Sequence, residues 1–229
     1  MRKLLLLLII AFISLNTHAQ FKPVLFGLRV GGNLGWMNAD AEGYESEGVV
    51  PGFTWGFMGE FFLMENYAIL TGFNMNFNGG KLTYPSFMDV DNDNFLDSGM
   101  LARKYSLKYI QIPLCLKMQT NVSDNLRIFG KIGIGTAFLL DGKANDDFTY
   151  NGGEVSRDKS DINDEVTLMR ESLIVGGGVE FLLKGSTALV VDLTYDNGFN
   201  NILLEGNLPS SVAPRAFHNY LELGVGILF

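Results

Sequence analysis

The sequence is poor in cysteine, proline and charge, and past its first residues it lacks any long apolar run. The single cysteine, Cys115, excludes an internal disulfide and a cysteine-based zinc site. Past residue 15 no stretch approaches the roughly 18 apolar residues of a transmembrane helix. Only 18% of the 229 residues are charged, and the net charge is −8 without a cluster of Lys or Arg. Nucleic acid is therefore not an expected partner.

The N-terminus has the pattern of an export signal. Arg2 and Lys3 precede an almost wholly apolar stretch over residues 4–15, and Ala19 supplies the small residue before a cut. The sequence predicts a signal peptide over residues 1–19 and a single mature domain over residues 20–229. A retained membrane anchor is the alternative, but the apolar stretch is short for one. Cys115 is expected to be buried, since it must remain unpaired in an oxidising compartment.

From residue 24 onward the sequence alternates with period two, which is typical of strands with two unlike faces. In the first segment Phe26, Leu28 and Val30 share one face, while Gly27 and Arg29 lie on the other. Gly is abundant at 27 residues and Pro scarce at 6, which fits strands and turns. Eight strands are predicted, within residues 26–36, 53–61, 69–78, 109–117, 127–138, 173–181, 189–195 and 217–229.

The predicted connections alternate between short and long. Tight turns are expected at residues 65–66, 123–125 and 184–186. Long polar loops are expected near residues 38–51, 79–103, 140–166 and 197–215. Short periplasmic turns, long extracellular loops and an even strand count describe a bacterial outer-membrane barrel. The predicted fold is all-β: an eight-stranded antiparallel up-and-down transmembrane β-barrel in the outer membrane of a Gram-negative bacterium.

A soluble barrel with its apolar face inward is the alternative, and three features disfavour it. The polar face consists largely of Gly and Asn, with fewer charges than a soluble surface carries. Large aromatic residues near strand ends suit interfacial girdles. The last strand ends in the aromatic Phe229, with Leu221, Leu223, Val225 and Ile227 on the same face. The apolar faces should contact outer-membrane lipid, and eight strands leave an interior that side chains can fill. The expected girdle residues are Trp36, Phe53, Tyr67, Phe77, Phe138 and Tyr195.

Several segments, in order, resemble the PorT-like outer-membrane β-barrel family of Bacteroidetes. They are the leader end THAQ, the first strand FGLRVGGN, residues 109–117 (YIQIPLCLK), the Gly-rich residues 175–180 and the terminal strand. The resemblance implies the barrel fold and an outer-membrane location. The strand ending at Phe229 is itself similar to the terminal strand by which the barrel assembly machinery recognises its clients. Some family members take part in type IX secretion and gliding, whereas most have no assigned activity. Pro113 removes a ladder hydrogen bond, so a local bulge is expected there, and the alternation drifts upstream at Tyr105 and Lys108.

The inward face is predicted to hold charges of both signs within one lumen. Because an isolated buried charge is very costly, these groups should pair. The leading interpretation is a structural plug, with Arg29 paired to one of the carboxylates; a gated conduit or proton path is the alternative. The predicted network comprises Arg29, Glu60, Arg127, Lys131, Glu180, Asp192 and Glu222.

The second long loop carries the sequence DVDNDNFLD over residues 89–97. Carboxylates at alternating positions direct hard oxygen ligands at one centre, as calcium loops do. The EF-hand pattern is incomplete, because Asn94 replaces the turn Gly and Met100 stands where the bidentate Glu belongs. Calcium at Asp89, Asp91, Asp93 and Asp97 is therefore one hypothesis, and a solvated acidic loop is the other. No further cofactor is expected.

An enzyme is not predicted, although lipid-modifying enzymes and proteases also use small barrels. Such sites need a His with a Ser or Asp partner. Beyond the leader the only histidine is His218, and Ser210 and Ser211 lie in the loop before it. The leading functional hypothesis is a structural or interaction barrel that acts through its extracellular loops, since recognition often resides on loops of a rigid scaffold. Alternatives are a component of a secretion apparatus and a lipid-modifying enzyme.

Overall fold

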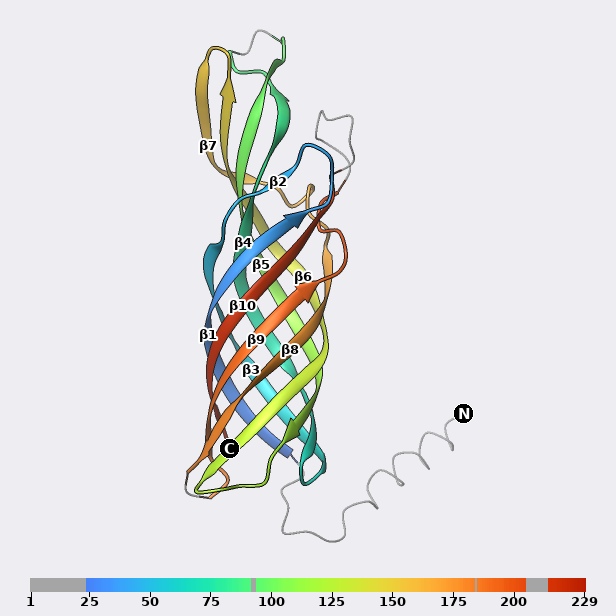
Figure 1. The fold of residues 1–229 in the computed structure, drawn as a ribbon. Helices are drawn as coiled ribbons and strands as arrows, with labels where there is room; N and C mark the ends of the chain where they lie inside the picture. Colours follow the sequence, from blue (N-terminus) through green and yellow to red (C-terminus); the bar gives the residue numbers. More distant parts are fainter. Residues whose placement is uncertain (1–23, 92–93, 184, 205–213) are drawn as a thin grey trace, which may run out of the picture.

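Eight strands form a closed antiparallel ring in the computed structural model, which describes residues 24–91, 94–183, 185–204 and 214–229. Each ring strand pairs with the next, and β10 pairs back to β1, with Leu34 opposite Leu221 (Figure 1). The predicted eight-stranded antiparallel barrel is confirmed. The predicted signal peptide lies outside the described residues. The ring strands are β1 (Val24–Ala39), β3 (Val50–Met64), β4 (Tyr67–Met88), β5 (Asp97–Gln119), β6 (Leu126–Tyr150), β8 (Met169–Leu182), β9 (Ala188–Gly198) and β10 (Ala216–Leu228).

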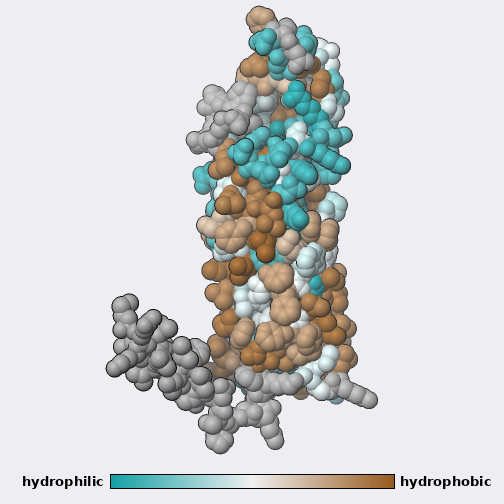
Figure 2. All heavy atoms as spheres, turned by 180° about the vertical axis from the view of Figure 1, so that it is seen from behind, coloured by the Kyte–Doolittle hydropathy of each residue, from teal (hydrophilic) through white to brown (hydrophobic). Residues whose placement is uncertain are grey.

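The two faces of each ring strand differ as the alternation predicts. On β1 the outward Leu28 is 56% exposed, whereas the inward Asn33 is 2% exposed. Outward aromatic rings stack across strands near the long-loop end: Trp36 on Tyr195 and Phe53 on Phe77, with centroids 6.0 and 4.3 Å apart. On the face shown in Figure 2, apolar side chains (the apolar belt) cover the lower part of the molecule and a polar region lies above them. In the described ranges no helix is long and apolar enough to cross a bilayer.

The short connections lie at one end of the barrel, together with the C-terminus (Figure 1). Glu65 and Asn66 join β3 to β4. Asp124 and Asn125, between β5 and β6, have φ angles of 51° and 64°. Asn and Asp tolerate this left-handed region better than most residues, which suits them to a tight turn.

The long connections contain more strand than the sequence suggested, and the expected loops at residues 79–103 and 140–166 are corrected. β4 continues to Met88, β5 begins at Asp97, and β6 continues to Tyr150, where it pairs with β7 (Gly153–Asp161). We call the part of these strands above the barrel the blade: residues 79–88, 97–108, 141–150 and β7 (Figure 1). Charged and polar residues on its outer face obscured the alternation. A further two-residue strand, β2 (Glu45–Ser46), pairs with β4.

No bulge occurs at Pro113, contrary to expectation. The β4–β5 register is the same on both sides of the proline. The ladder is interrupted for two residues, between the pair Thr71↔Leu114 and the pair Asn74↔Gln111, and then continues unshifted. The irregularity lies higher, where β5 steps from Lys108 to Tyr109 while β6 steps from Asp141 to Leu139. The extra residue in β6 is Leu140. Tyr105 and Lys108 are out of phase in hydropathy only: β5 keeps its geometric alternation, with Tyr105 buried inside and Lys108 outside.

Candidate functional site

The interior of the barrel contains clusters of ion pairs. In the first cluster the ammonium of Lys117 lies 2.6 Å from the carboxylate of Glu60 and also contacts Glu180. Arg127 bonds the second oxygen of Glu180 at 3.2 Å. The ring of Phe129 lies 4.5 Å from the Lys117 nitrogen. Lys117 is completely buried and thus depends on these contacts alone.

A second cluster contains the other predicted network residues. Arg29 donates to Glu222 at 2.5 Å and to Asp192 at 3.4 Å. Lys131 donates to the other oxygen of Asp192 at 2.5 Å, and the Thr194 hydroxyl donates to the same oxygen at 2.7 Å. The structure thus brings all seven predicted lumen residues into two clusters, with Arg29 on two carboxylates.

A third cluster was missed by the sequence analysis. Arg170 donates to Asp196 at 2.5 Å and to the carbonyl of His218 at 2.7 Å. The amide of Gln111 donates to the other oxygen of Asp196 at 2.8 Å, and the Tyr220 hydroxyl donates to the Gln111 carbonyl oxygen. Two of the missed residues share the parity of a predicted one: Arg170 that of Glu180 on β8, and Asp196 that of Asp192 on β9. Lys117 in the first cluster was not predicted either.

The described lumen is filled along its length. Its ion pairs join five basic residues to five acidic ones, so the charges balance: Arg29, Lys117, Arg127, Lys131 and Arg170 with Glu60, Glu180, Asp192, Asp196 and Glu222. A cavity between the first two clusters has a volume of about 20 Å³, which holds about one water. At the short-turn end Met58, Phe129 and Leu228 pack into an apolar cluster. Ion pairs and apolar side chains therefore occupy the part of the interior that the structure describes.

His218 lies in the interior, where it is completely buried. Its Nε2 lies 3.1 Å from the carbonyl oxygen of Gly79, and its ring lies 6.2 Å from that of Tyr220. This site bonds the backbone of β4 rather than opening to a substrate. Ser210 and Ser211 lie outside the described residues.

The acidic loop forms an ordinary turn in the part that the structure describes. Asp89 accepts a hydrogen bond from the backbone N–H of Asn94 at 3.2 Å, and Asn94 has a φ of 68°. Asp93 lies outside the described residues. Among the described ones no group of three His, Cys, Asp or Glu side chains is placed to hold a metal. Calcium binding at Asp89, Asp91, Asp93 and Asp97 therefore stays a prediction.

Above the lumen, the blade and the long connections form a layer that we call the cap, and this cap encloses an apolar core. Tyr44 stacks on Tyr84 with centroids 4.6 Å apart, and Arg103 joins the blade to the β7–β8 connection. Its guanidinium makes two bonds to Asp146, at 2.6 and 2.8 Å, and a further bond to Glu165. The cap closes the long-loop end of the barrel. Its other buried members include Leu82, Leu101, Tyr105, Phe148, Ile162, Val166, Ile202 and Leu203.

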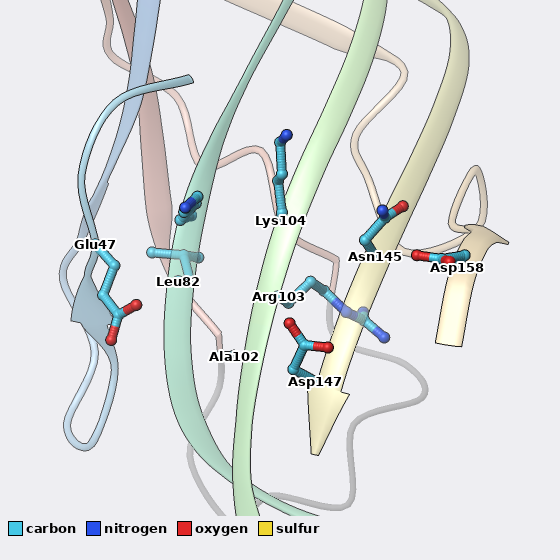
Figure 3. A pocket seen from close by; sticks show the side chains of 9 residues that line it. Glu47, Leu82, Ala102, Arg103, Lys104, Asn145, Asp147 and Asp158 are labelled. Atoms are coloured by element: carbon cyan, nitrogen blue, oxygen red, sulfur yellow. The ribbon is translucent and has the colours of Figure 1, made fainter. Parts of the chain in front are cut away.

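Two hollows lie on the outer surface, one on the blade and one where the blade meets the barrel. The upper hollow has a volume of about 280 Å³ and carries Lys81 and Lys104 together with Glu47, Asp147 and Asp158. Figure 3 shows Lys104 on β5 between Glu47 on one side and Asn145 and Asp158 on the other. The lower hollow has a volume of about 370 Å³ and is mainly apolar.

A family model described as "Outer membrane protein beta-barrel domain" matches residues 16–204. The chain belongs to this family. Solved structures of similar fold include Ail, the attachment invasion locus protein of Yersinia pestis (16% identity, 91% of this chain, 100% of that one, TM-score 0.42). OprG of Pseudomonas aeruginosa also matches (10% identity, 91% of this chain, 97% of that one, TM-score 0.49). So does the protease OmpT of Escherichia coli (10% identity, 93% of this chain, 99% of that one, TM-score 0.42). A search of curated proteins gave no match. Such distant likenesses carry no information about activity.

As a member of this family, the chain is a small barrel of the Gram-negative outer membrane. The short-turn end then faces the periplasm, and the cap and blade project outside the cell. The cap lies above the apolar belt, so its titratable side chains lie outside the membrane, as those of a soluble domain do. Burial in the cap raises the pKa of the Tyr105 phenol to about 12.

Proposed function

We propose that this outer-membrane barrel is a closed scaffold that presents its extracellular blade to a protein partner. The single observation that carries the proposal is the apolar tip of the blade. Phe95 is 77% exposed and Leu96 is 60% exposed, at the connection between β4 and β5. Large apolar side chains gathered on a projecting surface are typical of contact sites.

The outer face next to this tip is apolar too. Phe87 on β4 and Met100 on β5 both point outward and are exposed, and Met100 is the partner of Pro85 in the ladder. The free edge of β7 instead carries Arg157, Asp158 and Lys159, as edges protected against pairing often do. We therefore expect contact through the apolar tip rather than addition of a strand at β7.

A role in type IX secretion or gliding is the second candidate. It is supported by the ordered motifs that resemble the PorT-like family of Bacteroidetes, and the partner would then be a secretion subunit. We propose no catalytic role, since the buried His218 bonds a backbone carbonyl.

Crosslinking and affinity purification from native outer membranes test the proposal. The double variant Phe95→Ser/Leu96→Ser is compared with the wild type and with Val49→Ser, which changes an exposed apolar residue on another connection. We expect a specific extracellular or secretion partner with the wild type and the control, and a loss of most of it with the double variant. Recovery of no specific partner by the wild type, or equal recovery by the double variant, would refute the proposal. Known secretion subunits in the eluate would select the second candidate.

A further inference from the structure

Four lysines lie together on the outward face of β4, β5 and β6, directly above the aromatic band. Lys81 is opposite Lys104 in the β4–β5 ladder, and Lys104 is opposite Asn145. Two residues further toward the barrel Lys143 is opposite Ser106, and beyond that Lys108 is opposite Phe77. We call Lys81, Lys104, Lys108 and Lys143 the lysine patch.

The lysine patch has carboxylates nearby but forms few ion pairs: Asp141 lies directly opposite Lys108 in the β5–β6 ladder. Of the four patch lysines only Lys143 forms an ion pair with a described residue, Asp141, at 3.5 Å, and both side chains are about half exposed. Glu47, Asp147 and Asp158 border the upper hollow without forming an ion pair to Lys81 or Lys104. Like charges directly opposite one another destabilise an antiparallel pair, so the Lys81–Lys104 pair favours an added anion.

The lower hollow has an apolar floor beneath this charge. Val50, Pro51 and Phe53 of β3 and Phe77 of β4 line it, and its charged lining residues are Lys108, Lys143 and Asp141. The Lys108 ammonium lies 5.4 Å from the centroid of the Phe77 ring. An amphipathic hollow at the level of the aromatic girdle suits a molecule with an anionic head and an apolar tail.

The described residues of the opposite flank include no comparable group of lysines. There Trp36 stacks on Tyr195, and the nearby basic residue Arg215 is paired with Asp40 at 3.4 Å. The lysine patch is thus a feature of one side rather than a general basic collar.

We propose that the lysine patch and the lower hollow bind a phosphorylated glycolipid of the outer leaflet, of the lipid A type. Lys108 and Lys143 contact one phosphate, Lys81 and Lys104 reach anionic groups further from the membrane, and acyl chains lie against Phe53 and Phe77. Basic residues beside a membrane surface bind anionic lipid in this way. The site is separate from the proposed partner contact at the blade tip and does not depend on it.

The test uses the full mature barrel in nanodiscs of phosphatidylcholine with about one-tenth lipid A. Lipid that remains bound after extraction into detergent is quantified by mass spectrometry. Lys108→Gln/Lys143→Gln is compared with the wild type and with Arg157→Gln/Lys159→Gln, which removes two exposed charges from β7. Anomalous gel mobility before heating verifies that each variant is folded. Parallel arms use dephosphorylated lipid A and a competition with millimolar inorganic phosphate.

We expect the wild type and the β7 control to retain lipid A, and Lys108→Gln/Lys143→Gln to retain about tenfold less, with a greater loss when all four lysines are changed to Gln. Retention should fall with rising salt and with dephosphorylated lipid. Equal retention by the lysine-patch variant, an equal loss in the β7 control, or equal retention of dephosphorylated lipid would overturn the proposal. Complete displacement by inorganic phosphate would overturn it as well, since the site would then be one for small anions.

Discussion

Where strands such as β6 leave the membrane, their apolar side chains change from the outer face to the inner face. On β6, the part within the membrane directs Ile132 and Ile134 outward and Lys131 inward. In the blade, the same strand directs Phe148 inward and Asn145 outward. The barrel is polar inside and apolar outside, whereas the cap is apolar inside and polar outside. Each arrangement places apolar side chains away from water, so the solvent on the outside decides which face is which.

The two interiors are consequently held together by different forces. In the lumen, opposite charges pair because each would be costly alone. In the cap, stacked rings and aliphatic side chains form a conventional core around a single Arg103 cluster. The β6 bulge at Leu140 lies at the boundary between the two parts. Three experiments test this comparison.

The largest effect is expected for Lys117→Met in the lumen. The change removes the buried cation between Glu60 and Glu180, and an unpaired buried charge typically costs about 4 kcal/mol. Denaturant unfolding in lipid or detergent measures the loss. The double variant Lys117→Met/Glu60→Gln leaves the Arg127–Glu180 pair intact and should recover part of it. A loss below about 1 kcal/mol for the single change would show that the lumen is well solvated.

Phe148→Ala is expected to weaken the cap without opening the barrel. The ring is fully buried and stacks with Tyr150, their centroids 6.0 Å apart. Removing it should cost about 3 kcal/mol locally, seen as faster hydrogen exchange in the blade. The outward Phe87→Ala on β4 is the control, with little expected change. If the unfolding midpoint of the whole barrel fell by a corresponding amount, the cap and the lumen would not be independent in stability.

A lysine introduced on the outward face should be costly below the boundary and harmless above it. Ile132→Lys places a charge within the apolar belt and should cost about 2 kcal/mol, whereas Thr149→Lys on the same strand should change stability by less than about 0.5 kcal/mol. Unfolding of both variants in the same lipid gives the comparison directly. Similar costs at both positions would mean that the belt extends over the blade.

Sequence periodicity was a good guide wherever one face meets lipid. Leu28, Ile132 and Leu223 alternate with small or polar residues, and the ring of strands follows from that pattern. The blade resembles loops in the sequence because its outer face is charged and its inner face mixes Tyr, Leu and Arg103. The pairing of the lumen charges cannot be predicted from the sequence either. Arg170 precedes the clear alternation of its strand, and its acceptor Asp196 lies on a different strand.

The sequence by itself determined the number of barrel strands, the two faces of each and the presence of charges on the inner one, because alternation is a local property of the chain. Only the tertiary structure decided which charges meet, where the barrel gives way to the cap, and that Lys81, Lys104, Lys108 and Lys143 share one surface. These depend on register and closure, which join residues distant in the chain at separations that no local pattern specifies.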